Sequence, residues 1–231
     1  MHVDHAIQSR KSVRRFLPTG VSPEVVRHIL KVASRAPSGN NIQPWRVYVV
    51  GGEIREALCR DILQAAREEP ERHQAEYTYY PTQWVEPYRE RRRRNGFALY
   101  EQLGIERDDH QRREQQMLRN YQFFDAPVGL LVTLDRRLNT GSYLDVGMFI
   151  QNILIAARGQ QLHTCAQAAF APFHDVVRRH LPLGEDEILV CGIALGHGDN
   201  EAAENWLQSE RQPVETFASF HGFREAQLEA C

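Results

Sequence analysis

The chain has 231 residues, of which 42% are hydrophobic and 25% are charged, and its formal net charge is -2. These values are typical of a globular protein that is long enough to bury a substantial core. The nearly balanced charge gives no global basic field, so it does not favour nucleic acid or an anionic membrane as a partner. The longest apolar runs, such as residues 128–134, are far too short to span a bilayer.

The cysteines and histidines show no spacing that would indicate a disulfide framework or a metal site. The four cysteines are scattered and are Cys59, Cys165, Cys191 and Cys231. The first residues lack the basic start and apolar core of a signal peptide. The sequence therefore predicts a cytoplasmic protein with reduced thiols and no bound metal.

Start and stop signals predict the elements of the first third of the chain. Ser22 is a helix-capping residue, and Pro23 stands at the first helical position, where its missing N–H costs nothing. The apolar residues that follow, Val32 among them, recur at helical spacing and indicate one buried stripe. The expected elements are a helix over residues 3–10, a helix from Ser22, a strand over residues 46–50 and a helix over residues 53–68.

Apolar runs predict the elements of the remaining chain, after an aromatic and arginine-rich segment over residues 70–110 that is neither a clean helix nor a clean strand. The helix over residues 142–158 is apolar on nearly all sides, so it must be buried centrally or in a subunit interface. The other expected elements are helices over residues 110–123 and 174–180 and strands over residues 127–134, 162–166 and 187–195.

Five arginines lie within residues 89–94, between aromatic side chains. Such a run can bind nucleic acid, with the aromatic rings stacking on bases. Glu86, Glu90 and Glu101 lie close to it, however, and acidic neighbours favour a solvated, ion-paired helix face instead. We therefore expect no nucleic-acid partner.

Two short segments carry chemistry. Residues 9–16 place Arg10, Lys11, Ser12 and Arg14 within a few positions, a set that suits a doubly charged phosphate because arginine binds it with two N–H groups. Residues 36–45 form a loop of small residues rich in amide and hydroxyl donors, which lets backbone approach a planar polar ligand. Together they predict a phosphorylated cofactor that carries a ring.

With these segments, residues 7–223 resemble the nitroreductase family of FMN-dependent, homodimeric NAD(P)H oxidoreductases. The resemblance implies that Arg10, Lys11, Ser12, Arg14 and Arg211 grip the flavin phosphate and ribityl chain. It implies that a loop of the other subunit, with Pro37, Ser38, Gly39 and Asn41, closes over the flavin. It further implies that the backbone of Ala168 and Ala169 lies at flavin N5, with Asn120 near the ring.

Two positions depart from the family pattern. Ser209 stands where many relatives have a lysine, so only Arg211 remains of a Lys/Arg pair. The pair Ala168 and Ala169 replaces the Glu-Gly of some bacterial members, which keeps a backbone N–H but removes the acid side chain. The segment that contains Asn120 is similar to the subset of the family that acts on nitroaromatics.

The resemblance implies an α+β fold with a central mixed, mostly antiparallel sheet flanked by helices. A single FMN-binding domain over residues 1–231 is expected, with a lid-like insertion at 70–110 and a C-terminal extension at 197–231 that wraps the partner subunit. Tyr79, Tyr80, Trp84, Tyr88 and Phe97 are expected to form an aromatic wall in that lid.

The implied function is reduction of nitroaromatic compounds, with quinones as secondary acceptors, by a ping-pong hydride-transfer mechanism that uses NADH or NADPH. No side chain is expected to be catalytic, because the flavin ring carries the redox chemistry. A reductive dehalogenase of the same fold family is a competing function, although residues 70–110 contain no lysine for a halotyrosine zwitterion. A non-enzymatic flavin- or nucleotide-binding protein would also fit these segments, and an RNA-binding module would fit the arginine run.

Overall fold

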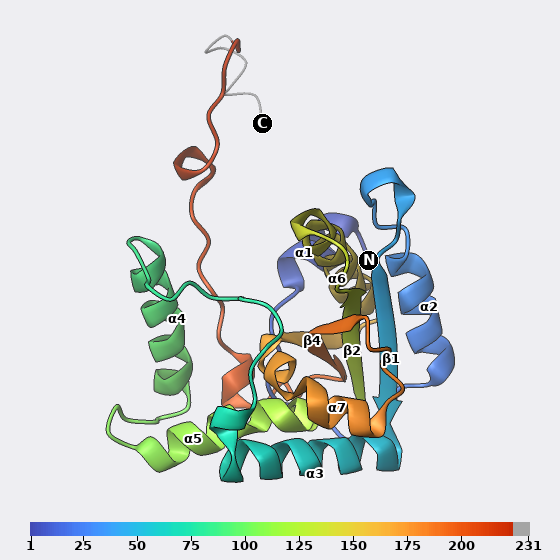
Figure 1. Cartoon of the computed structure of the whole chain (residues 1–231). Helices are drawn as coiled ribbons and strands as arrows, with labels where there is room; N and C mark the ends of the chain where they lie inside the picture. The colour runs from blue at the N-terminus through green and yellow to red at the C-terminus, as the bar shows by residue number, and fades with distance from the viewer. Residues whose placement is uncertain (224–231) are drawn as a thin grey trace.

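A computed structural model describes residues 1–223 and places a four-stranded antiparallel sheet between helices (Figure 1). The strand order is β1-β2-β4-β3, and the only parallel pairing of described residues is an isolated bridge between Ser12 and Thr164 at the β3 edge. All four expected strands are confirmed to within one residue. They are β1 (Trp45–Gly51), β2 (Val128–Asp135), β3 (His163–Gln167) and β4 (Glu187–Gly196).

The second helix begins where its cap predicts. Ser22 Oγ accepts a hydrogen bond from the N–H of Val25 at 3.4 Å and starts the second helix. That helix buries Val26, Ile29 and Ala33, whereas the prediction that Val32 belongs to the buried stripe is wrong, because its side chain is on the solvent face. The helices are α1 (Val3–Ser9), α2 (Pro23–Ala33), α3 (Gly52–Glu68), α4 (Tyr88–Gln102), α5 (His110–Leu118), α6 (Thr140–Gly159) and α7 (His174–His180).

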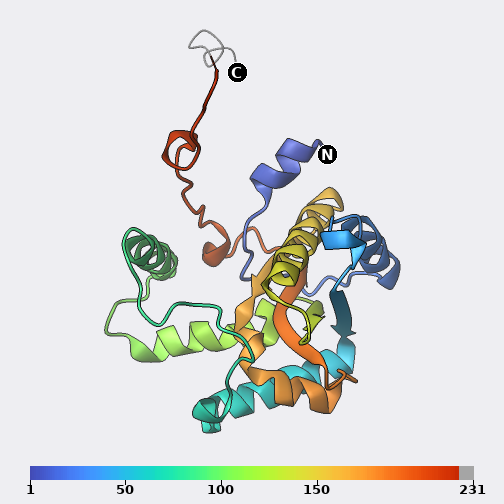
Figure 2. The same ribbon diagram turned by 45° about the horizontal axis from the view of Figure 1, so that its top comes forward.

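The sheet separates two apolar clusters. On β2, Val128, Leu130, Val132 and Leu134 pack with α2 and α6, while the alternate residue Leu131 packs with α3 and α7. Burial on both faces explains why this strand is continuously apolar in the sequence. Figure 2 shows the same layers, with α6 and α2 on one side of the strands and α3 and α7 on the other.

Two glycines in the sheet make room for phenylalanine rings. A Cβ on Gly129 would come within 2.5 Å of the Phe123 ring, and one on Gly192 would collide with the Phe170 ring. The two rings stack at 4.3 Å between centroids. They thereby fix the 3-10 helices η3 (Arg119–Asp125) and η4 (Ala168–Phe173) side by side on the sheet. The expected helix over residues 110–123 accordingly ends at Leu118, where η3 takes over.

Residues 70–110 contain the 15-residue helix α4, which includes the arginine run for which a helix face was expected but no helix bounds were predicted. It buries none of its residues, so it has no apolar stripe to reveal it. The expectation of an ion-paired face is confirmed by Arg89–Glu86 at 2.7 Å and Arg93–Glu90 at 2.9 Å. Figures 1 and 2 show α4 standing apart from the sheet.

The chain after β4 runs past α4 and leaves the body of the molecule (Figure 2). Phe217, Phe220 and Phe223 on this arm are exposed by 72%, 56% and 61%. The last part of the expected C-terminal extension, including Cys231, lies outside the described residues. Within residues 1–223, no helix is both long enough and apolar enough to cross a membrane.

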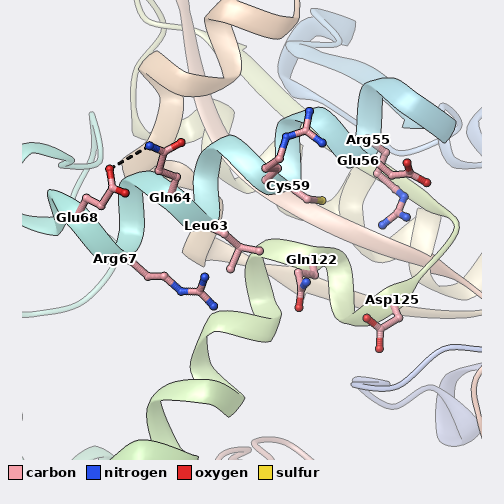
Figure 3. A pocket seen from close by; sticks show the side chains of 10 residues that line it. Arg55, Glu56, Cys59, Leu63, Gln64, Arg67, Glu68, Gln122 and Asp125 are labelled. Carbon is pink, nitrogen blue, oxygen red and sulfur yellow. Dashed lines mark hydrogen bonds between the residues drawn. The ribbon is translucent and has the colours of Figure 1, made fainter.

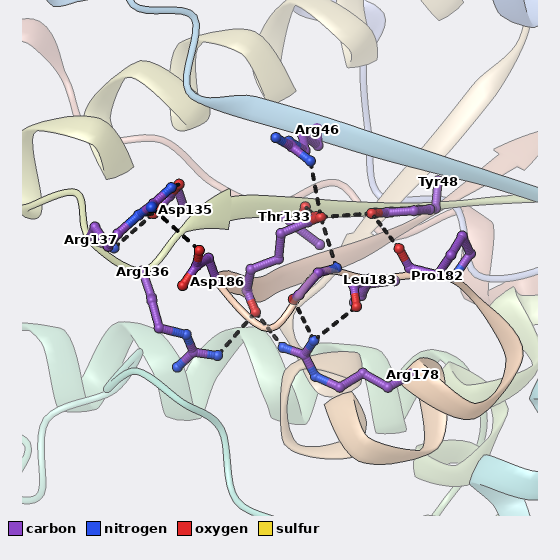
Figure 4. A network of polar contacts seen from close by, with 12 residues as sticks. Arg46, Tyr48, Thr133, Asp135, Arg136, Arg137, Arg178, Pro182, Leu183 and Asp186 are labelled. Carbon is purple, nitrogen blue, oxygen red and sulfur yellow. Dashed lines mark hydrogen bonds and ion pairs between the residues drawn. The ribbon is translucent and has the colours of Figure 1, made fainter.

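A buried carboxylate, Glu187, organises the sheet at the start of β4. It is 4% exposed and accepts hydrogen bonds from Thr133 Oγ1, from Tyr48 Oη at 2.8 Å and from the N–H of Gly184 at 3.1 Å. Arg46 adds an ion pair at 3.3 Å. Figure 4 shows these side chains converging from β1 and β2 on the same point. We call this group the Glu187 network.

Candidate functional site

A hollow of about 650 Å³ lies between the end of α1 and the segment after η5 (Ala203–Asn205), and we call it the cationic hollow. It brings together five residues from the two ends of the sequence: Arg10, Lys11, Ser12, Arg14 and Arg211. None of the described residues that line it is acidic. The arrangement is a strong attractor for a polyvalent anion.

The charges in the cationic hollow are not neutralised by carboxylates of residues 1–223. Among residues 1–223, neither Arg10, Arg14 nor Arg211 forms an ion pair with a carboxylate. Burial, together with the nearby Arg211 charge, lowers the pKa of Arg10. A bound dianion would relieve this repulsion and supply the missing acceptors, so the residues present fit a phosphate group.

Asn205 organises the wall of the cationic hollow, and the sequence analysis missed it. The side chain is 2% exposed; its Oδ1 accepts from the Arg14 N–H at 2.7 Å, and its Nδ2 donates to the Arg15 carbonyl at 2.7 Å. The Asn205 carbonyl accepts from Lys11 Nζ. These bonds fix residues 11–15 against the later segment. A lone asparagine in an irregular stretch gives no periodic signal that could have marked it.

A second group of candidate residues meets at the end of β3. Gln167 Nε2 donates to the Asn120 carbonyl at 2.7 Å and thereby joins η3 to the start of η4, where Ala168 and Ala169 lie. Asn120 Nδ2 donates to the Met117 carbonyl at 2.9 Å. The Gln167 Oε1 atom is buried without a partner among the described residues. Such an atom is available to a donor group on a ligand.

The loop over residues 37–41 lies elsewhere, on α6. The Gly39 N–H points at both oxygens of the Asp145 carboxylate, at 3.3 and 3.4 Å, and Asn41 has a positive φ of 58°. Ser38 Oγ accepts from the Gln43 N–H at 3.0 Å. Pro37, Gly39 and Asn41 are exposed. One side of the loop therefore contacts α6, and its other side is open to solvent or to a ligand.

Within one chain these three groups stay separate. The cationic hollow is lined neither by the loop residues Pro37, Ser38, Gly39 and Asn41 nor by the η3–η4 residues Asn120, Ala168 and Ala169.

The aromatic wall expected in the lid is only partly present. Tyr79, Tyr80 and Trp84 lie together, with ring centroids 4.6 Å apart for the tyrosine pair and 5.4 Å for Tyr80 and Trp84. Phe97 belongs to a different cluster, because the Arg107 guanidinium covers its ring at 4.5 Å. The exposed rings of Tyr79 and Tyr80 stand at 79° to each other and give an apolar surface. The nearby Tyr77 hydrogen-bonds the Val190 carbonyl on β4 and contacts Tyr143 on α6.

The electrostatic field of the cationic hollow extends to the start of β3. His163 Nδ1 accepts from the Gly198 N–H at 3.2 Å. Burial, with the charges of Arg158, Lys11 and His197 adding to it, lowers the pKa of His163 to about 4. The imidazole is therefore neutral near pH 7 and does not act as an anion-binding cation.

Another hollow, of about 550 Å³, lies along α3 and lacks the excess positive charge of the cationic hollow (Figure 3). Three arginines and three acidic residues line it, so its charges balance. Burial raises the pKa of its Cys59 thiol to about 11, which keeps the sulfur protonated and unreactive.

The chain is similar to known proteins in both sequence and fold. Residues 7–197 match the model of the nitroreductase family. The chain is 41% identical to a nitrobenzene nitroreductase of Ectopseudomonas oleovorans and 40% identical to a chloronitrobenzene nitroreductase of Comamonas testosteroni; each alignment covers 94% of this chain and 96% of the relative. The structure is similar to that of the FMN- and NADPH-dependent nitroreductase NfnB from sphigopyxis sp. strain HMH, with a TM-score of 0.93 and 35% identity over 96% of this chain and 100% of the other.

Proposed function

The chain belongs to the nitroreductase family, and we propose that it is an FMN-dependent, homodimeric enzyme that uses NADH or NADPH to reduce nitroaromatic compounds. The observation that carries this proposal is the cationic hollow, whose unneutralised side chains match a flavin phosphate. In the proposal Arg10, Lys11, Ser12, Arg14 and Arg211 hold that phosphate and the ribityl chain.

Bound FMN would supply the two-electron redox chemistry, and the chain would supply position and electrostatics. The N–H groups of Ala168 and Ala169 would donate to the flavin edge, and Asn120 would lie beside the ring. Gln167 would fix this corner, since its amide already joins Asn120 to the end of β3 at 2.7 Å. No side chain is assigned a catalytic role.

A second subunit would complete the site. Leu144 and Met148 on α6 are exposed by 70% and 40%, and Phe217 and Phe220 on the C-terminal arm are exposed by 72% and 56%. A shared interface would cover these surfaces and bring the partner's loop, with Pro37, Ser38, Gly39 and Asn41, over the flavin. We propose that residues 1–231 form one such domain, in the cytoplasm, where its free, buried thiols Cys59, Cys165 and Cys191 stay reduced.

Nitroaromatics are the proposed acceptors because the relatives that share about two fifths of the sequence are named for nitrobenzene and chloronitrobenzene. The exposed rings of Tyr79 and Tyr80 on the lid suit a flat aromatic molecule. Quinones are proposed as secondary acceptors. A reductive dehalogenase ranks behind these, because residues 70–110 contain no lysine to bind an amino-acid carboxylate.

The test of the proposed function starts from the visible spectrum of the purified protein. We expect a yellow protein that oxidises NADH or NADPH with nitrobenzene, more slowly with benzoquinone, and not with a halotyrosine. A yellow protein that reduces none of them would indicate a non-enzymatic flavin carrier. A colourless protein that FMN cannot reconstitute would contradict the proposal.

The dimer is tested separately by Leu144→Glu, which places a charge on the exposed apolar face of α6. We expect the variant to elute as a monomer in size-exclusion chromatography and to lose bound FMN. Ile54→Glu is the matched control, because Ile54 on α3 is also exposed, by 55%. If both variants stay dimeric, α6 is not the interface.

A further inference from the structure

A second hollow, of about 340 Å³, lies between α4 and residues 207–212, and we call it the α4 hollow. It shares Ser209 and Arg211 with the cationic hollow, so the two spaces adjoin along one stretch of chain. Its volume lies at the lower end of the range of about 300–1,000 Å³ that is typical of small-molecule pockets. Nothing in the proposed function occupies it.

The α4 hollow has an excess of positive charge. Arg91 and Arg94 are three positions apart on α4 and therefore lie on one face of the helix, and Arg211 lies across from them. Glu210 is the only acidic residue among the described residues that line it, and its carboxylate pairs with Arg94 at 2.9 Å. Arg91 pairs with no carboxylate in residues 1–223.

The uncharged groups of the α4 hollow suit a phosphate monoester on a sugar. Ser209 Oγ and the Asn95 side chain lie 2.9 Å apart and can both turn toward a phosphate oxygen or a ribose hydroxyl. Ala98 and Leu207 add apolar surface of the kind that contacts a sugar or base. Two guanidinium groups beside such donors form the arrangement that arginine provides for phosphate.

We propose that the α4 hollow binds the 2′-phosphate of NADPH through Arg91 and Arg94 and thereby makes the enzyme select NADPH over NADH. This inference rests on the proposed function, which leaves the choice of dinucleotide open. Sites that prefer NADH place a free carboxylate on the ribose hydroxyls, whereas an arginine accommodates the 2′-phosphate. Here the one available carboxylate, Glu210, is held by Arg94.

A 2′-phosphate site in the α4 hollow also explains why Ser209 stands where many relatives have a lysine. Ser209 lies in the wall that separates the two hollows, and its hydroxyl bonds Asn95 on α4. A lysine at position 209 would extend its side chain into one of the two hollows. Its ammonium group would then also attract the phosphate of the ligand in the neighbouring hollow. The short serine side chain leaves both spaces open, and Arg211 lines both of them.

The experiment uses the FMN-loaded protein and measures binding as well as activity. Adenosine 2′,5′-bisphosphate and 5′-AMP are titrated by calorimetry into the wild type, Arg91→Ala and Arg89→Ala. Because Arg89 faces Glu86 instead of the α4 hollow, its variant removes the same charge from the same helix and serves as the control. KM and kcat are measured for NADPH and NADH with nitrobenzene.

We expect the bisphosphate to bind the wild type about tenfold more tightly than 5′-AMP, as a charge-assisted phosphate contact provides. Arg91→Ala should remove that difference and raise KM for NADPH about tenfold, with kcat and the KM for NADH unchanged. Glu210→Gln should free Arg94 and lower the KM for NADPH.

Equal binding of the two nucleotides to the wild type would overturn the inference, as would equal effects of Arg91→Ala and Arg89→Ala. A raised KM for NADH in Glu210→Gln would also overturn it, because Glu210 would then read the ribose hydroxyls. In each case a yellow, nitrobenzene-reducing protein keeps the proposed function intact. A protein that cannot bind FMN would overturn the proposed function itself.

Discussion

Two charged groups lie near opposite ends of β4, and they differ in where their partners are. In the Glu187 network the buried carboxylate meets a hydroxyl, a phenol, an N–H and a guanidinium, all from its own chain. In the cationic hollow, Arg10, Arg14 and Arg211 meet no carboxylate among residues 1–223. Charges that are satisfied internally hold the fold, whereas charges left unsatisfied at an open surface indicate a ligand.

The largest expected effect comes from disrupting the Glu187 network. Glu187→Ala leaves Thr133 Oγ1 and the Gly184 N–H without their acceptor, leaves Tyr48 Oη only the Pro182 carbonyl, and should lower the free energy of unfolding by about 3 kcal/mol. Urea unfolding of the flavin-free protein measures it. FMN affinity of the folded fraction should stay within about twofold, since substitutions at distant sites act independently.

Glu187→Gln is the control for that prediction, because it keeps the shape and one acceptor oxygen. It should cost less than Glu187→Ala. If both substitutions leave the unfolding midpoint unchanged, the Glu187 network does not hold the sheet end together.

The next effect comes from the cationic hollow, where a substitution should lower FMN affinity and leave the stability of the protein unchanged. Arg10→Ala should weaken FMN binding about ten- to thirtyfold, since a charge-assisted contact to phosphate contributes about 1.5–2 kcal/mol. The flavin-free protein should not be destabilised, because removing Arg10 also removes its repulsion from Arg211. Flavin fluorescence quenching gives the affinity and urea unfolding the stability.

Arg27→Ala on the exposed surface of α2 serves as the charge-matched control for Arg10→Ala. An Arg10→Ala protein that binds FMN as the control does would contradict the assignment of the cationic hollow.

A smaller effect is a pH dependence that originates beside the cationic hollow. Because burial and neighbouring cations lower the pKa of His163 to about 4 from 6.5, the unfolded chain binds more protons than the folded chain between these values. Stability should therefore fall as the pH drops from 6.5 toward 4. His163→Asn keeps an acceptor for the Gly198 N–H and should flatten this part of the profile. An unchanged profile would mean that other groups cause the acid sensitivity.

The smallest expected effect is an increase in FMN affinity. Ser209→Lys adds a cation to the wall of the cationic hollow and should tighten FMN binding by about threefold, the size of a partly exposed charge interaction. The loss of the Ser209–Asn95 contact at 2.9 Å offsets part of the gain. Flavin fluorescence quenching is the measurement, and Ser209→Ala, which removes the contact without adding charge, is the control. Weaker binding by Ser209→Lys than by Ser209→Ala would contradict the prediction.

Most helices and strands could be predicted because local sequence patterns specify them. The apolar run of β2, the cap at Ser22 and the all-round apolar pattern of α6 each depend on a few neighbouring residues. The bounds of helix α4 could not be predicted for the same reason: the helix buries none of its residues, so only the ion-paired face around its arginines was expected. The family resemblance identified candidate ligand residues, but it gave no reason to connect Asn205 with them or to expect the contact between Gln167 and Asn120.

The sequence by itself determined the individual strands, most of the helices and the presence of a cationic segment at residues 10–14, because these follow from local periodicity and composition, whereas the sheet was implied by the family resemblance. Only the tertiary structure decided which distant residues meet. It placed Arg211 opposite Arg10, joined Asn120 to β3 through Gln167, and left the loop over residues 37–41 on another face. Contacts between residues nearly two hundred positions apart, such as Asn205 with Arg14, depend on how whole elements pack, and no local pattern records that.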